Sequence, residues 1–169
     1  MKIVYHHRTQ GGGAEGVHIR EVVKALRQLG HQVKLISPPN VDPFKISANP
    51  KAPKNKSSGL KKKIVLALPQ VCFEILELGY NVWAYLRLNS VVKKIQPDFI
   101  YERYAFFCWA GVKIAKKFHV PIILEVNEIS GIKRQRPQKM VGLCRRIEEK
   151  IFSEADALIV VSDLKSLTI

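Results

Sequence analysis

Hydrophobic and polar positions alternate along this chain with two periods, which predict strands and helices in turn. Residues 1–5 and 31–36 are short apolar runs typical of β-strands. Between them, apolar residues recur every three or four positions: Ile19, Val22, Val23, Leu26 and Leu29. This spacing predicts a helix over residues 17–29, with Gly30 at its C-terminus. The chain therefore opens with a strand, a glycine-rich turn at residues 11–13, a helix and a second strand.

The same alternation resumes after residue 95. Strands are predicted at residues 98–101, 120–126 and 157–161, and helices at residues 106–117 and 138–152. The last strand is almost wholly apolar, as expected for a strand covered on both faces of a sheet. Five strands that alternate with helices predict an α/β fold with a doubly wound, parallel, Rossmann-like sheet.

The middle of the chain, at about residues 40–95, departs from this pattern. Residues 43–73 contain no Asp or Glu, and three consecutive lysines, Lys61, Lys62 and Lys63, precede an apolar stretch at residues 64–88. Charged and polar side chains within that stretch argue against a transmembrane span. We interpret the region as a basic, variable connector followed by a long amphipathic helix.

Glu74, Glu77 and Asn81 are expected to lie on another side of that helix, away from its apolar stripe. A break in the helix is considered near Pro69 or Gly79. The stripe is formed by Leu68, Val71, Cys72, Ile75, Leu78, Val82, Trp83 and Leu86. It can pack on the sheet or lie against a membrane, in which case Lys61, Lys62 and Lys63 form an anion patch that contacts acidic headgroups.

Composition narrows the class of protein. Lys and Arg number 28 against 14 Asp and Glu, a net charge of +14, which favours anionic partners such as nucleic acid, acidic lipids or phosphorylated substrates. The three cysteines form no C-x-x-C pair, so we expect reduced thiols rather than disulfides or metal ligands. The short apolar run at the N-terminus does not resemble a signal peptide. We expect one domain over residues 1–169, located in the cytoplasm.

Ligands of open parallel sheets bind at the carboxyl ends of the strands, so the residues that follow each predicted strand are candidates for a site. They are His6, His7, Gly11, Gly12, Gly13, Ser37, Asn40, Glu102, Arg103, Tyr104, Asn127, Glu128, Ser162 and Asp163. The glycine turn at the start of a helix can bind a phosphate through free backbone N–H groups, or it can be only a tight turn. Glu102 and Arg103 can equally form a surface ion pair.

The order and spacing of several segments resemble the N-terminal half of a family 4 glycosyltransferase, which has the two-domain GT-B fold. The matching segments are residues 11–16 leading into 18–33, 98–104, 120–127 and 154–163. The resemblance implies transfer of a sugar from a nucleotide-sugar donor to an acceptor with retention of anomeric configuration. It implies no metal or other cofactor.

The resemblance also implies roles for individual residues. Gly12 and Gly13 would bind the donor phosphates, and four residues would bind the acceptor: His18, Glu102, Arg103 and Tyr104. Asn127 stands where many relatives have a histidine, and Glu128 follows it. Because an amide is not a general base, Asn127 would orient a hydroxyl group in the catalytic centre, assisted by Glu128.

Relatives carry a second, donor-binding domain with a glutamate pair spaced E-x7-E, for which this chain has no room. We therefore expect the isolated chain to be inactive, as a truncated form, a gene fragment or one subunit of a split enzyme. The acceptor is expected to be a glycan or a lipid-linked sugar of cell-envelope polysaccharide biosynthesis, at the cytoplasmic membrane face. The alternative is a non-catalytic anion-binding or nucleic-acid-binding α/β module, although the basic runs lack interleaved aromatic residues.

Overall fold

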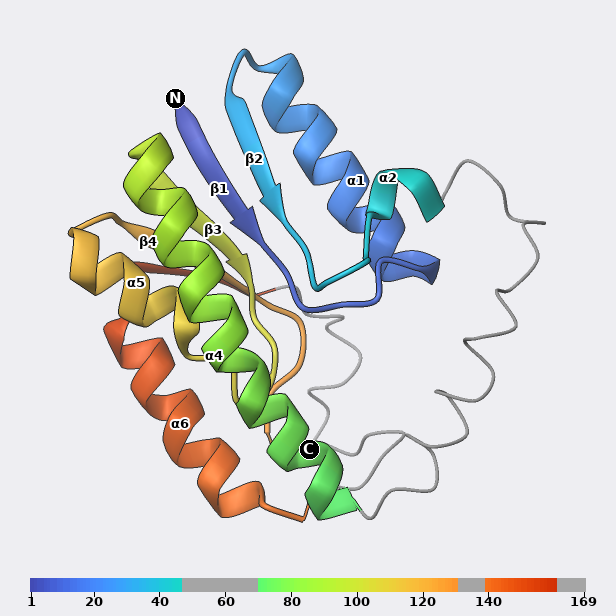
Figure 1. Ribbon diagram of the computed structural model, residues 1–169, viewed down its shortest axis with the longest axis vertical. Helices are drawn as coiled ribbons and strands as arrows, with labels where there is room; N and C mark the ends of the chain where they lie inside the picture. The colour runs from blue at the N-terminus through green and yellow to red at the C-terminus, as the bar shows by residue number, and fades with distance from the viewer. Residues whose placement is uncertain (47–69, 131–138, 161–169) are drawn as a thin grey trace.

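The computed structural model describes residues 1–46, 70–130 and 139–160 (Figure 1). Its five strands form one all-parallel sheet in the order β2-β1-β3-β4-β5. They are β1 (Lys2–His6), β2 (Gln32–Ile36), β3 (Phe99–Arg103), β4 (Ile122–Val126) and β5 (Ala157–Val160). The predicted parallel α/β fold is confirmed, and each strand lies within two residues of its predicted bounds.

Helices cover both faces of the sheet (Figure 1). They are α1 (Gly13–Gln28), α2 (Pro43–Ile46), α4 (Gln70–Ile95), α5 (Ala110–Phe118) and α6 (Val141–Glu154). Helices α1 and α2 pack on the face that carries Tyr5 and Leu35. Helices α4, α5 and α6 pack on the opposite face, which carries Val4, Ile100 and Leu124. The sheet is therefore doubly wound.

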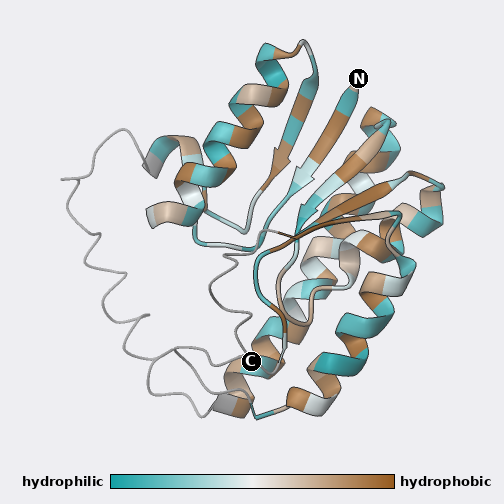
Figure 2. Cartoon of the chain, turned by 180° about the vertical axis from the view of Figure 1, so that it is seen from behind, coloured by the Kyte–Doolittle hydropathy of each residue, from teal (hydrophilic) through white to brown (hydrophobic). Residues whose placement is uncertain are grey.

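The larger part of the core lies between the sheet and helices α4 to α6. Val4, Ile100 and Leu124 are fully buried there, together with Leu88 and Ile114 from the helices. Each such side chain contributes about 1.5–3 kcal/mol of hydrophobic stabilisation. Hydrophobic residues run along the central strands, whereas α1 alternates between hydrophilic and hydrophobic positions (Figure 2). This core fixes the carboxyl edge of the sheet, where the candidate residues lie.

Helix α4 is rotated relative to the predicted orientation, although Leu78 and Trp83 of the predicted stripe do pack against the core. Glu74 and Asn81 are buried, whereas Val71, Ile75 and Val82 of the expected packing stripe are exposed. The helix continues through Gly79 without a break, so the break considered at that position is absent. The expectation that the apolar stripe packs on the sheet is therefore wrong for these residues.

The reason is that neighbouring helices need acceptors for their first N–H groups. Asn81 Oδ1 accepts hydrogen bonds from the backbone N–H groups of Trp109 (2.8 Å) and Ala110 (3.1 Å) at the start of α5. Glu74 accepts from the N–H groups of Lys139 (2.8 Å) and Met140 (2.7 Å) just before α6. An unsatisfied buried N–H costs about 1–3 kcal/mol, so these four hydrogen bonds favour the rotation of α4 that buries Glu74 and Asn81.

Strand β5 also differs from expectation. Leu158, Ile159 and Val160 are exposed in the part of the chain that the structure describes, so the predicted coverage of this strand on both faces is not found there. Three predicted features, Lys61–Lys63, Ser162 and Asp163, lie outside the described residues. Within residues 1–46, 70–130 and 139–160, none of the helices has the length and apolar character needed to cross a bilayer.

Candidate functional site

A pocket of about 260 Å³ opens at the carboxyl edge of the sheet, where β1, β3 and β4 end. It is lined by Arg8, Thr9, Gln10, Glu15, Arg103, Tyr104, Ala105, Phe106, Asn127 and Glu128. Four of the residues predicted from the strand ends, Arg103, Tyr104, Asn127 and Glu128, thus meet in one pocket. The expectation that ligands bind at the carboxyl ends of parallel strands therefore brought together residues from segments more than twenty positions apart.

A buried carboxylate, Glu125, lies beneath this pocket. It accepts hydrogen bonds from Asn127 Nδ2 (2.8 Å) and the hydroxyl of Tyr101 (2.9 Å), and it pairs with Arg103. Burial alone would raise the pKa of Glu125, but the hydrogen bond from Asn127, the nearby His18 and the charge of Arg103 together lower it. Glu125 is therefore an anion that holds two pocket side chains in place.

His18 contacts this carboxylate from α1. Its Nε2 lies 3.0 Å from Glu125 Oε1, while its ring remains partly exposed. His18, predicted to bind the acceptor, therefore lies beside Glu125 and is not among the residues that line the pocket. Sequence reasoning missed Glu125 itself, although one charged residue within the apolar strand Ile-Ile-Leu-Glu-Val is a readable signal.

Arg8 lines the pocket and is another residue that the sequence analysis did not single out. Its guanidinium donates to Glu77 Oε1 (2.6 Å) on α4 and to the carbonyl oxygen of Phe106 (3.1 Å). Both arginines of the pocket are thus paired with carboxylates, and Glu15 and Glu128 also line it. A pocket with balanced charge and many donors and acceptors suits a hydroxyl-rich ligand better than a bare phosphate.

Glu102 does not line the pocket, although it precedes Arg103. Neighbouring strand residues point to opposite faces, and the Glu102 carboxylate is buried beneath α4 and α5, where it lies 3.0 Å from His6 Nδ1. A Cβ at Gly111 would overlap this carboxylate, so α5 packs closely over it. Neither the predicted role at the acceptor nor a surface ion pair with Arg103 matches this placement.

His6, Glu102 and Cys108 form a buried cluster whose possible ligand atoms lie within 4.8 Å of one another. Burial and the neighbouring Glu102 carboxylate raise the pKa of the Cys108 thiol. His6 is further engaged with the hydroxyl of Tyr80, 3.3 Å from its Nε2. The cluster is best described as a buried hydrogen-bond network that ties β1 and β3 to α4.

Tyr104 contributes to the pocket, but its hydroxyl is already engaged. It donates to Glu148 Oε2 on α6 (2.8 Å), and Glu148 also accepts from the backbone N–H (2.9 Å) and hydroxyl (2.8 Å) of Ser130. This network fixes the segment that follows β4, which includes Asn127 and Glu128. Tyr104 therefore lines the pocket while its side chain is anchored in the core.

The glycine turn borders the pocket through Gln10 and Glu15. Gly11 and Gly13 have φ angles of 71° and 62°, in the left-handed region that favours glycine. A Cβ at Gly16 would overlap the carbonyl oxygen of Gly11, so the turn and the first turn of α1 touch directly. Gly12 and Gly13 do not line the pocket, but open space surrounds both, so the N-terminus of α1 is accessible.

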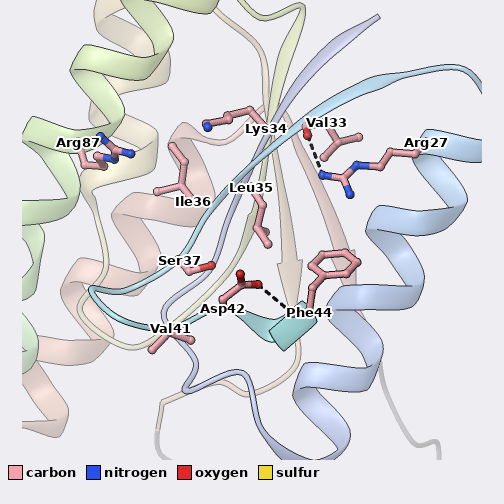
Figure 3. Close-up of a pocket in the computed structure, with 10 residues that line it drawn as sticks. All are labelled: Arg27, Val33, Lys34, Leu35, Ile36, Ser37, Val41, Asp42, Phe44 and Arg87. Atoms are coloured by element: carbon pink, nitrogen blue, oxygen red, sulfur yellow. Dashed lines mark hydrogen bonds between the residues drawn. The ribbon is translucent and has the colours of Figure 1, made fainter. Parts of the chain in front are cut away.

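A larger hollow of about 550 Å³ lies along the outer edge of β2 (Figure 3). Arg27 of α1 and Arg87 of α4 reach toward it from opposite sides of the strand, and Asp42 and Phe44 close its lower end (Figure 3). Arg27 donates to the carbonyl oxygen of Val33 (3.2 Å). This hollow contains none of the residues predicted for the donor or the acceptor.

Comparison with solved structures shows the fold. The chain is similar to MnaA of S. aureus bound to UDP, with 16% identity and a TM-score of 0.56 over 94% of this chain and 37% of that one. It is also similar to the UDP-GlcNAc 2-epimerase of Methanocaldococcus jannaschii, with 14% identity and a TM-score of 0.57 over 97% and 40% of the two chains. The glycosyltransferase SsfS6 of Streptomyces sp. SF2575 gives 15% identity and a TM-score of 0.57 over 98% and 51%.

The chain thus spans about half or less of the length of these structures. No match was found among curated proteins. The family model for Glycosyltransferase Family 4 matches residues 11–164, which include the glycine turn, all of the pocket residues from Glu15 to Glu128, and β5. On this match, and with the Rossmann-like sheet it requires, the chain belongs to glycosyltransferase family 4.

Proposed function

We propose that this chain is the acceptor-binding domain of a retaining glycosyltransferase, which transfers a sugar from a nucleotide-sugar donor to a glycan or lipid-linked acceptor. The observation that carries the proposal is the pocket at the carboxyl edge of a family 4 domain, in which Arg103, Asn127 and Glu128 meet. Its balanced charge supports a sugar as the ligand.

Asn127 is the proposed orienting group of the catalytic centre. Glu125 accepts a hydrogen bond from one N–H of the Asn127 amide. The amide oxygen and the second N–H of Asn127 remain for hydroxyl groups of the acceptor. The amide does not take up a proton, so Asn127 acts by position. Glu128, exposed at the rim of the same pocket, is the proposed assisting carboxylate.

The donor is proposed to approach from the glycine turn. The first N–H groups of α1 have no partner within the helix, and they can bind a pyrophosphate at Gly12 and Gly13 without a metal ion. Most of the stabilisation of a transition state would come from a second, donor-binding domain. We therefore propose that residues 1–169 alone do not catalyse transfer, and that they act with such a domain in the same polypeptide or in a partner chain.

The proposed location is the cytoplasm, where nucleotide sugars serve as donors. The three cysteines, Cys72, Cys108 and Cys144, are all free thiols, which supports a reducing compartment.

The test begins with the mass of the native polypeptide that contains this chain, which identifies the accompanying donor domain. The complete enzyme is then assayed with labelled nucleotide sugars and with oligosaccharide or lipid-linked acceptors. Asn127→Ala should lower kcat/KM for the acceptor at least tenfold, whereas Asn89→Ala, far from the pocket on α4, should have no effect. Absence of sugar transfer, or unchanged transfer by Asn127→Ala, would overturn the proposal.

A further inference from the structure

The outward side of α4 is an apolar surface, hereafter the α4 stripe. It consists of Val71, Ile75, Leu76, Val82 and Leu86, which are between 42% and 63% exposed. Their spacing places them on one side of the helix over about 22 Å, because each residue advances the helix by about 1.5 Å. Gly79 lies on the same side with open space around it, so no polar side chain interrupts the stripe.

The outward orientation of the stripe is imposed by the rest of the fold. Glu74 and Asn81 on the inner side accept four hydrogen bonds from backbone N–H groups at the start of α5 and just before α6. Rotation of α4 to bury the stripe would break these four hydrogen bonds. A helix that is apolar on most sides needs an apolar environment on its outer side as well.

The charges around the stripe indicate which kind of partner covers the outer side of α4. Neither carboxylate of α4 faces outward, since Glu74 is buried and Glu77 pairs with Arg8. Exposed cations continue from the stripe along α4 and onto α5, which packs beside it and has no acidic residue: Arg87, Lys93, Lys94, Lys113 and Lys117. A second copy of the chain would bring these like charges together. A partner with an apolar interior and an anionic surface fits both features.

We propose that the α4 stripe and the cations beside it bind the surface of a membrane that contains anionic lipids, with α4 lying on the bilayer. The N-terminal half of α4 extends beyond the carboxyl ends of the strands (Figure 1). The Arg8–Glu77 pair connects this half directly to the wall of the pocket. A membrane bound there lies next to the pocket, so a lipid-linked acceptor reaches Asn127 from the bilayer. Only the delivery of a lipid-linked acceptor to Asn127 depends on the proposed function.

Sedimentation of the full chain with vesicles tests the proposal. Vesicles of phosphatidylglycerol and phosphatidylcholine should bind the chain at low salt, and vesicles of phosphatidylcholine alone should bind it at least tenfold more weakly. A Val82→Ser/Leu86→Ser variant should lose at least tenfold in partitioning to the anionic vesicles. The matched control is Val17→Ser/Leu29→Ser, which removes two exposed apolar side chains from α1 and its C-cap and should change partitioning less than twofold.

Equal partitioning of the α4 variant and the native chain would overturn the proposal, as would an equal loss in the α1 control. Self-association in the absence of lipid that the α4 variant abolishes would identify a second copy as the occupant instead. All four positions are exposed, and a thermal melt checks that both variants remain folded. Because vesicle binding needs no donor or acceptor, its failure would leave the proposed sugar pocket untouched.

Discussion

The side-chain amide of Asn127 donates a 2.8 Å hydrogen bond to the buried carboxylate of Glu125. The two residues are adjacent on the same side of β4 and its extension, and Glu125 also pairs with Arg103 of β3. One buried anion therefore sets the positions of an amide and a guanidinium from two strands. The pocket is organised before any ligand binds, which reduces the entropy lost on binding.

Substitution of Glu125 by Gln should destabilise the fold and loosen the pocket. It removes the charge that neutralises Arg103, and breaking a buried ion pair costs about 3–5 kcal/mol. We expect the free energy of unfolding, measured in urea at pH 7, to fall by about that amount. Glu149→Gln, at an exposed position of α6, should change it by less than about 0.5 kcal/mol.

The same substitution has a pH signature. Because the pKa of Glu125 is lowered from 4.5 on folding, its contribution to stability is present above pH 4.5 and is lost as the pH falls through the lower, folded-state value. The difference in unfolding free energy between the native chain and Glu125→Gln should therefore shrink below pH 4.5. A difference that is constant from pH 7 to pH 3 would contradict an ionised, paired Glu125.

His7 should make the protein less stable in mild acid. Burial and the neighbouring His6 lower the pKa of His7 from 6.5 to about 4, and its Nε2 lies 2.8 Å from the hydroxyl of Ser37. Between these two pH values the unfolded chain binds a proton that the folded chain does not, so stability falls as the pH decreases. The expected slope is about 1.4 kcal/mol per pH unit, which His7→Gln should reduce. Urea midpoints that do not respond to His7→Gln would show that another group titrates.

Gly16→Ala should disturb the glycine turn. Its Cβ would overlap the backbone carbonyl group of Gly11, which cannot move aside as the end of a flexible side chain can. We expect a loss of about 2 kcal/mol or more in unfolding free energy. Gly12→Ala is the control, because Gly12 has a φ of −99° and open space, and it should cost less than about 1 kcal/mol. Equal losses in both variants would contradict a direct contact between the turn and the helix.

Glu102 and Arg103 should have separable effects although they are neighbours in sequence. Glu102→Gln alters the buried contact with His6 and should lower stability by about 1–3 kcal/mol, with no change in the acceptor KM of the complete enzyme. Arg103→Ala should raise that KM, because Arg103 lines the pocket. If Glu102→Gln raised the acceptor KM as much as Arg103→Ala, the placement of Glu102 away from the acceptor would be wrong.

The fold could be predicted because each element carries a local signal. The apolar spacing of α1 and the short apolar strands depend only on near neighbours in sequence. The orientation of α4 could not be predicted from the sequence, because the hydrogen-bond partners of Asn81 and Glu74 lie 28 and 65 residues away along the chain. Periodicity alone assigned the apolar side of α4 to the core, whereas hydrogen bonds to distant N–H groups decided its rotation.

The candidate site was predictable in part for a similar reason. Residues that directly follow strands share the carboxyl edge, which located Arg103 and Asn127. Alternation of side chains along a strand places Glu102 on the face opposite to Arg103, and it places Glu125 on the same face as Arg103. The pairing of Glu125 with His18 depends on the packing of α1 over the sheet, which no local pattern specifies.

We propose that the pocket formed by Arg8, Arg103, Asn127 and Glu128 binds the sugar acceptor. Amide chemical-shift mapping of the isotope-labelled chain, during titration with a panel of monosaccharides and oligosaccharides, tests this binding without the donor domain. We expect saturable shifts at residues 8–10, 103–106 and 127–128, which Arg103→Ala abolishes. Shifts confined to the hollow beside β2, or none at any sugar concentration, would contradict it.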